Sequence, residues 1–218
     1  MSTSDRLPWR EAARARLHDA TLAELLGRLG TTDVSFNYRW EHVTAVVTLA
    51  LRLAELTGAD ADIVEAAAWL HDICKYSDGQ RHPQAGAAYA RAFLPTTDFP
   101  PEKIEAVAGA IADHMGLWRD EPLLILEAQV LWDADKLAKI GLTAVFHWTG
   151  GRLAGDEMRT LADLIARGRD ADWQSKTVAS MHTEPARRAA ATRLAAYHAL
   201  YDALERELAG DDLVTSVS

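Results

Sequence analysis

The chain has 218 residues, of which 49% are hydrophobic and 25% charged, and its formal net charge is -9 at pH 7. This length and composition suit a single globular domain with a sizeable core, whereas the phosphates of duplex nucleic acid would repel so acidic a chain. No apolar stretch approaches membrane-spanning length, the N-terminal segment lacks the apolar core of a signal peptide, and the single cysteine, Cys74, cannot form an internal disulfide. We therefore expect a cytoplasmic protein that binds neither a membrane nor duplex nucleic acid.

Helical periodicity runs through most of the sequence, and sustained alternation of apolar and polar residues is nearly absent. The expected helices span about residues 9–29, 37–57, 62–76, 83–94, 101–115 and 121–140. Asp62 and Glu65 have the spacing of a capping pair for the third of these helices. The Gly150–Gly151 pair is expected to break the chain, and two or three further helices are expected within residues 155–209. The sequence thus predicts an all-α fold without internal repeats.

Ionisable side chains lie on three of the apolar helices, where burial without a partner would be costly. His42 lies among valines and Trp40, His71 and Asp72 follow the run AAAWL, and the segment VLWDADKLAKIG contains two aspartates. Each of these residues alone also suits a structural role, as a hydrogen-bonded core histidine or a capping aspartate. Their coincidence on three helices favours a shared divalent cation, and imidazole with carboxylate is a ligand set suited to manganese, iron, cobalt, zinc or nickel.

The same residues carry a resemblance to the HD-domain metal-dependent phosphohydrolase superfamily, in which His…His-Asp…Asp from separate helices holds a divalent metal. The segments AAAWLHDICK, RHPQAGAAYA, IADHMG and LWDADKLAKIG are similar to segments of that family. SKTVASMHTEPARRAAATR resembles the C-terminal helical part of small bacterial HD hydrolases, so the likeness covers about residues 39–207. Two positions depart from the pattern, because Cys74 replaces the glycine of HDIGK and YRWEH introduces the first histidine. The second departure weakens any transfer of substrate identity.

The resemblance implies a single all-helical HD-type domain over residues 1–218, a helical bundle with a metal-binding core at about 36–141 and additional C-terminal helices at about 155–209. Its metal ligands would be His42, His71, Asp72 and one aspartate of DADKL. Asp133 and Asp135 lie about 200° apart around a helix, so only one of them is expected to face the ion. The resemblance favours Asp135 as the ligand. Asp133 would then orient a histidine without binding the ion itself.

Two more histidines extend the proposed site. In some branches of the superfamily, histidines in segments like those of His82 and His114 complete a second metal site or contact the substrate phosphate. The alternative is structural, because His82 precedes Pro83 at a helix start and His114 suits a surface position at a helix end.

Basic side chains could bind a substrate phosphate beside the ion. Lys75 follows His71 and Asp72 by one helical turn and is the favoured catalytic lysine. Lys136, Lys176 and Arg187 are further candidates for substrate binding, whereas Lys139 suits a solvated helix face.

The resemblance implies hydrolysis of a phosphate ester or anhydride by a metal-activated water, with a small phosphorylated compound, favoured to be a nucleotide, as the substrate. The cofactor would be one divalent ion (Mn, Fe, Co, Ni, Zn or Mg), a second ion being left open, and Asp72 would also accept a proton from the water. The alternative is a non-catalytic regulatory module that binds a metal or nucleotide with a retained HD site. Homodimer formation is left open.

Overall fold

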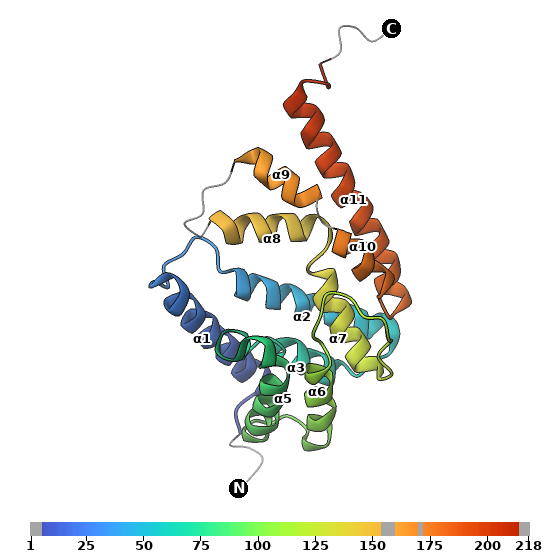
Figure 1. Ribbon diagram of the computed structural model, residues 1–218. Helices are drawn as coiled ribbons and strands as arrows, with labels where there is room; N and C mark the ends of the chain where they lie inside the picture. The colour runs from blue at the N-terminus through green and yellow to red at the C-terminus, as the bar shows by residue number, and fades with distance from the viewer. Residues whose placement is uncertain (1–5, 154–159, 170–171, 214–218) are drawn as a thin grey trace.

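The computed structural model describes residues 6–153, 160–169 and 172–213. Its α-helices are α1 (Trp9–Leu29), α2 (Tyr38–Thr57), α3 (Ala61–Leu70), α4 (Lys75–Asp78), α5 (His82–Phe93), α6 (Ile104–Ala112), α7 (Leu126–Leu137), α8 (Gly141–Leu153), α9 (Leu161–Arg169), α10 (Asp172–Ala179) and α11 (Glu184–Ala209). The 3-10 turns are η2 (Gly79–Arg81), η3 (Leu94–Thr96) and η4 (Pro101–Lys103). These ranges contain no β-strand, so the all-α prediction is confirmed (Figure 1). Of the expected C-terminal extension, residues 155–159 and 170–171 lie outside the described residues.

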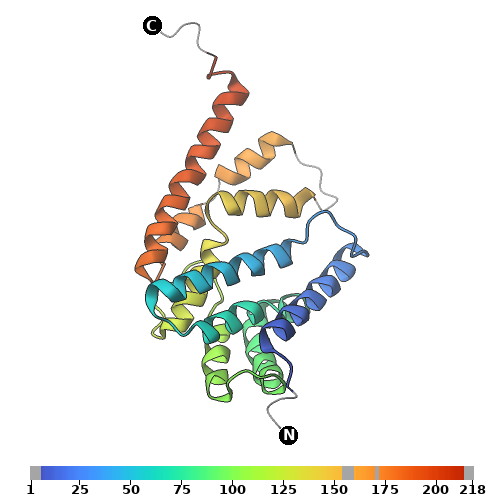
Figure 2. The same cartoon turned by 180° about the vertical axis from the view of Figure 1, so that it is seen from behind.

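Helix α2 lies at the centre of the molecule, between a group formed by α1, α3, α5 and α6 and a second group formed by α8 and α9 (Figures 1 and 2). It packs against α3 and α7, while α3 packs on α6 and α6 on α5. Helix α11 packs against α7, α8, α9 and α10, and its C-terminal end extends beyond the body of the molecule. No helix in the described part of the chain combines the length and apolar character needed to span a bilayer.

The apolar residues form two cores. The larger one joins α1, α2, α3, α5, α6, α7 and the start of α11, and Trp132 is its largest fully buried side chain. A smaller cluster of Ile165, Tyr197 and Tyr201 joins α9 to α11, with Val145 of α8 packed against it. The C-terminal helices therefore pack against the larger bundle and also make apolar contacts with one another.

The expected end of the third helix was wrong. Helix α3 stops at Leu70, and the chain then makes tight turns in which the Ile73 N–H donates to the Leu70 carbonyl (3.2 Å) and the Lys75 N–H to the Asp72 carbonyl (2.9 Å). In a continuous helix, adjacent side chains diverge by about 100°. His71 itself keeps helical backbone angles, and both His71 and Asp72 are buried.

The expected capping pair was also wrong. Asp60 caps α3, because its Oδ1 accepts hydrogen bonds from the backbone N–H groups of Asp62 (3.0 Å) and Ile63 (3.3 Å). The Glu65 carboxylate instead accepts a hydrogen bond from Arg10 of α1 (2.8 Å). Glu65 thus ties α1 to α3 rather than closing the first turn.

Two more boundaries differ from the sequence prediction. The helix expected over 121–140 begins only at Leu126, and the Leu123 N–H donates to His182 Nε2 (2.9 Å) instead of to a helical carbonyl. The Gly150–Gly151 pair does not break the chain but lies inside α8. A side chain at position 150 would lie 3.0 Å from the Phe36 ring, so this glycine permits close packing inside a helix.

Asp133 fastens the start of α11 to α7. Its carboxylate is fully buried and accepts hydrogen bonds from the backbone N–H groups of His182 (2.8 Å) and Thr183 (2.7 Å). The His182 ring lies 3.3 Å away through Nδ1. Because Thr183 caps α11 through its own side chain, Asp133 fixes the place from which the longest helix departs.

We predict that Asp133→Ala lowers the free energy of unfolding by about 3 kcal/mol, because it leaves two buried N–H groups without an acceptor. Urea denaturation followed by circular dichroism measures this change. Asp202→Ala serves as the matched control, because Asp202 is an exposed aspartate of α11 that pairs with Arg169 of α9. This substitution should change stability little. Equal effects of the two substitutions would contradict the anchoring role of Asp133.

Candidate functional site

Four side chains from three parts of the fold meet inside the bundle. His42 lies in the second turn of α2, His71 and Asp72 lie directly after α3, and Asp135 lies on α7. All four are buried, with His71 and Asp135 at 0% exposure. The packing of α2 between α3 and α7 therefore brings residues that are distant in the sequence to one place.

The ring nitrogens of the two histidines face the two carboxylates. His42 Nε2 lies 3.1 Å from Asp135 Oδ1 and 4.0 Å from Asp72 Oδ2. His71 Nε2 lies 3.8 Å from both of these carboxylate oxygens. One ligand atom each from His42, His71 and Asp72 fits within 4.8 Å of the others, a grouping that could hold a metal ion.

The hydrogen bonding of His71 shows why this group suits a cation. His71 Nδ1 lies 2.8 Å from the carbonyl oxygen of Ala68, and a carbonyl can only accept, so Nδ1 carries the proton. Burial lowers the pKa of His71 to about 3, so the ring is neutral and the lone pair of Nε2 points toward anionic oxygens. Among the described residues, neither His71 Nε2 nor either ring nitrogen of His42 has a hydrogen-bond partner. A cation between these atoms would offset the repulsion between the nitrogen lone pairs and the carboxylate oxygens. It would also give the unpartnered ring nitrogens a binding partner.

Both carboxylates remain ionised despite their burial. Burial alone would raise the pKa of Asp135, but the ammonium groups of Lys136 and Lys139 lower it well below its usual value. Burial likewise opposes the charge on Asp72, but its surroundings, which include the Arg39 guanidinium, hold the pKa of Asp72 well below the ordinary range. The site thus offers neutral nitrogen and ionised oxygen donors at the same time.

A second group shares Asp72 with the first. His82 Nε2 lies 3.2 Å and His114 Nε2 lies 3.7 Å from Asp72 Oδ1, and the two Nε2 atoms are 3.1 Å apart. The Nδ1 atoms of both rings face backbone carbonyls at 2.6 Å, so each Nε2 again carries a lone pair when the ring is neutral. Asp72, His82 and His114 also fit the geometry of a metal-holding group, and all three are buried.

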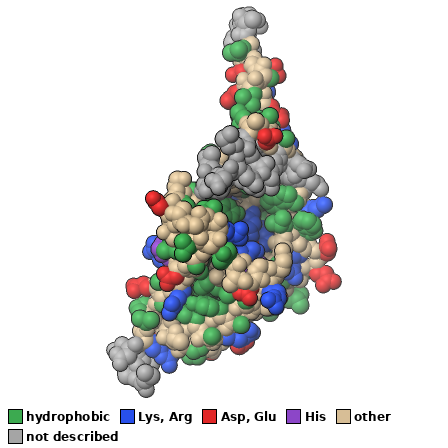
Figure 3. All heavy atoms as spheres, turned by 60° about the vertical axis from the view of Figure 1, so that its left-hand side comes forward, with side chains coloured by type: hydrophobic (Ala, Val, Ile, Leu, Met, Phe, Trp, Pro, Cys, Tyr) green, Lys and Arg blue, Asp and Glu red, His purple; other side chains and the backbone are tan. Residues whose placement is uncertain are grey.

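Basic side chains surround the two groups. Lys75 Nζ lies 3.1 Å from His82 Nε2, and Lys136 donates to Asp135 and to the carbonyl oxygen of His114 (2.9 Å). Burial lowers the pKa of Lys136 to about 8, although the Asp135 charge opposes that shift. Figure 3 shows Lys and Arg side chains gathered in a recess near the centre of one face, with hydrophobic side chains beside them.

Sequence reasoning missed two cations of this site. Arg39 donates to Asp72 and also contacts Glu24 of α1 at 3.1 Å, and Lys139 Nζ lies 2.5 Å from Asp135 Oδ1. Lys139 was expected on a solvated face, and that expectation was wrong. The signal was present in the spacing, since Arg39 precedes a ligand candidate by three residues and Lys139 follows one by four, which places each pair on one helix face.

Three other predicted residues lie elsewhere. Asp133 faces the start of α11. The histidine that it contacts is His182, which belongs to neither of the two buried groups. Lys176 lies on α10 with its Nζ 5.3 Å from the centre of the Trp118 ring. Arg187 donates to the carbonyl oxygens of His182 (2.5 Å) and Met181 (3.4 Å), which holds its guanidinium at the beginning of α11.

Comparison with known proteins agrees with the fold. Residues 39–140 match the model of the HD domain family, a span that contains the metal-ligand candidates His42, His71, Asp72 and Asp135. YpgQ of Bacillus subtilis strain 168 is 28% identical over 197 residues, which cover 85% of this chain and 91% of YpgQ.

Two solved structures share the fold over nearly the whole chain. A predicted HD superfamily hydrolase from an uncultured Thermotogales bacterium has a TM-score of 0.60 at 23% identity, covering 96% of this chain and 99% of that one. The crystal structure of Bacillus subtilis YpgQ in complex with ADP has a TM-score of 0.62 at 22% identity, covering 91% of this chain and 97% of that one. The match of residues 39–140 to the HD domain family model confirms the resemblance expected from the sequence.

Proposed function

We propose that the chain is a divalent-metal-dependent phosphohydrolase, which cleaves a phosphate ester or anhydride bond in a small phosphorylated substrate. The observation that carries this proposal is the buried meeting of neutral imidazole lone pairs with ionised carboxylates. His71 Nε2 lies 3.8 Å from oxygens of both Asp72 and Asp135, with no hydrogen-bond partner among the described residues. Such an arrangement is unfavourable without a cation and well suited to one.

The ion would be held by His42, His71, Asp72 and Asp135. A divalent cation bound there supplies Lewis-acid polarisation of a phosphoryl oxygen and lowers the pKa of a water that it binds. The mixed nitrogen and oxygen donors suit manganese, iron, cobalt, nickel or zinc. The bond from His71 Nδ1 to the Ala68 carbonyl keeps this ring in the tautomer that metal binding requires.

The chain's own cations would bind and orient the phosphate. Lys75 is half-buried beside His82, and burial lowers its pKa while the Asp72 charge opposes the shift. Its ammonium therefore stands next to the proposed ion, where a phosphoryl oxygen would carry growing negative charge in the transition state. Arg39 holds Asp72 in its ionised form, ready to accept a proton from water.

A nucleotide is the substrate class that these features favour. The fold is shared with YpgQ, a protein crystallised in complex with ADP. The recessed basic side chains of Figure 3 offset the overall negative charge of the chain locally, as binding of a polyphosphate requires.

We expect the purified protein with added Mn²⁺ to release phosphate or pyrophosphate from members of a nucleotide panel, and Asp72→Asn to reduce turnover at least ~100-fold because it weakens both the ion site and the proton acceptor. Steady-state release of phosphate and pyrophosphate measures this. Asp19→Asn, an exposed aspartate on α1, is the matched control and should retain full turnover. Stoichiometric nucleotide binding without turnover would instead favour a regulatory module.

Metal binding is testable apart from turnover. We predict that Mn²⁺ at ~100 times its dissociation constant stabilises the fold by about 2.7 kcal/mol, so that EDTA lowers Tm. In His71→Gln this difference between Mn²⁺ and EDTA should shrink strongly, whereas His198→Gln, an exposed histidine on α11, should preserve it. Differential scanning calorimetry with elemental analysis provides the measurement, and a protein that holds no metal and shows no shift would refute the proposed site.

A further inference from the structure

The guanidinium of Arg39 lies between two carboxylates, one inside the proposed metal site and one outside it. Its Nη1 donates to Asp72 Oδ2 at 2.5 Å, and its Nε donates to Glu24 Oε2 at 3.1 Å. The side chains of Arg39 and Glu24 are only 14% and 13% exposed, so water competes little for the bond between them. Glu24 belongs to α1, which lies outside the segment that matches the HD domain model. A residue outside that segment therefore reaches the proposed metal site through a single arginine.

The C-terminal half of α1 is fastened to two elements beside the site. Asn37, the residue that caps α2, donates from its side-chain amide to Thr21 Oγ1 of α1 at 3.0 Å. At Gly27 of α1, a Cβ atom would lie 1.9 Å from the hydroxyl oxygen of Tyr76, so the absence of a side chain lets α1 approach α4 closely. Because α1 contacts both the start of α2 and α4, Glu24 has a fixed place beside Arg39.

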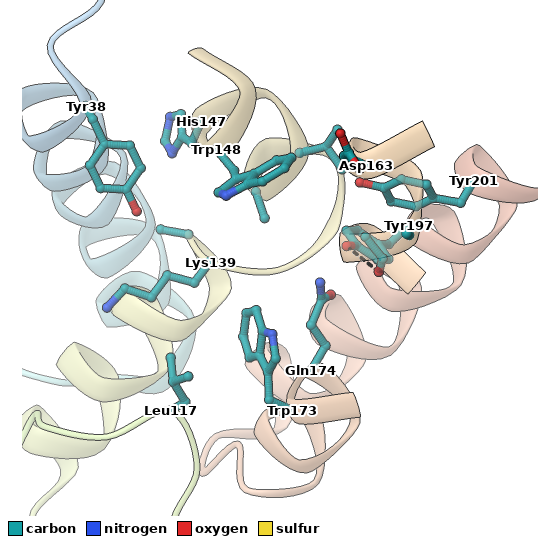
Figure 4. A pocket seen from close by; sticks show the side chains of 15 residues that line it. Tyr38, Leu117, Lys139, His147, Trp148, Asp163, Trp173, Gln174, Tyr197 and Tyr201 are labelled. Atoms are coloured by element: carbon teal, nitrogen blue, oxygen red, sulfur yellow. Dashed lines mark hydrogen bonds between the residues drawn. The ribbon is translucent and has the colours of Figure 1, made fainter. Parts of the chain in front are cut away.

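The cations that pair with the two buried carboxylates differ in their surroundings. Lys139, whose Nζ lies 2.5 Å from Asp135 Oδ1, also lines a cavity of about 1040 Å³ between α2, the end of α7 and the C-terminal helices (Figure 4). The described residues that line this cavity do not include Arg39. Aromatic rings form much of the cavity wall: Tyr38, Trp148, Trp173, Tyr197 and Tyr201. Lys139 thus borders open space, whereas Arg39 has a second carboxylate that restrains it.

This restraint affects how Asp72 meets a metal ion. An arginine can donate two hydrogen bonds to one carboxylate, and such bidentate pairs are strong. Here Arg39 Nη1 contacts Asp72 Oδ2, while Nε is engaged by Glu24. Asp72 Oδ2 also lies 3.8 Å from His71 Nε2, where an ion would bind. Without Glu24, the guanidinium would be free to turn and pair with both oxygens of Asp72, in competition with the ion.

We propose that Glu24 is a positioning residue of the metal site, which holds Arg39 on one oxygen of Asp72 and so keeps this carboxylate available to a divalent ion. The inference rests on the proposed metal-dependent function and adds to it a contribution from α1. The alternative is that the pair of Glu24 and Arg39 only ties α1 to α2. The pair of Glu65 and Arg10 is such a tie, since it joins α3 to α1 through a 2.8 Å contact between side chains outside the two buried groups.

The two explanations differ in what they predict for metal affinity. We expect Glu24→Ala to raise the dissociation constant for Mn²⁺ about tenfold, the usual scale for a residue that orients a metal ligand, and excess Mn²⁺ to restore occupancy of the site. Isothermal titration calorimetry of the intact chain measures this constant. The matched control Glu65→Ala should lower the Tm of the metal-free protein but leave the dissociation constant unchanged. Glu24→Gln keeps the side-chain shape and should shift the constant in the same direction, so the test survives if Glu24→Ala folds poorly.

A double substitution tests whether Glu24 acts through Arg39. In an Arg39→Met background, adding Glu24→Ala should change the Mn²⁺ dissociation constant less than about twofold, because the residue that transmits the effect is gone. A full tenfold effect in that background would overturn the inference.

A metal-free crystal structure of Glu24→Ala provides a readout that needs neither the ion nor turnover. It should show the Arg39 guanidinium bonded to both oxygens of Asp72, and an unmoved guanidinium would overturn the inference. If the native chain binds Mn²⁺ and Glu24→Ala binds it equally well, Glu24 has no positioning role and the metal site stands. If the native chain binds no Mn²⁺, the metal site and the role of Glu24 are both overturned.

Discussion

Two buried carboxylates are the constraint on which the arrangement of this molecule depends. Asp72 and Asp135 are almost completely enclosed, and an ionised carboxylate in such a place is stable only if opposite charge and hydrogen-bond donors surround it. Lys136 and Lys139 supply this for Asp135, and Arg39 supplies it for Asp72. The compensating groups come from α2 and from the end of α7, so the charges fix how these helices and the turn after α3 lie together.

The two parts of the chain contribute different kinds of side chain. The segment that matches the HD domain model contains the ionised oxygens and neutral nitrogens, in a core where alanines and Trp132 are fully buried. The C-terminal helices supply the aromatic walls of the cavity and join the bundle through the Asp133 carboxylate at the start of α11.

The sequence predicted most of the helices and the residues of the buried groups, because long periodic segments and ionisable groups on apolar faces are strong signals. It did not predict the break after Leu70, since AAAWLHDICK keeps helical periodicity while tertiary packing of His71 and Asp72 decides the backbone. Lys139 was missed because a lysine near a helix end has the same sequence pattern whether it faces water or a buried carboxylate. The cavity beside Tyr38 and Trp173 was not predictable either, because its lining comes from five helices, the turn after α7 and the loop at Leu117, whose relative positions only the tertiary structure defines.

The two oxygens of Asp72 face different groups of side chains. Oδ2 faces Arg39, His42 and His71, whereas Oδ1 faces His82 and His114. Lys75 Nζ lies 3.1 Å from His82 Nε2, and a second ion would need the lone pair of this nitrogen. An ammonium donor and a metal cannot share one lone pair, and two cations so close would repel each other. A second ion at His82 and His114 would therefore have to displace the Lys75 ammonium from His82.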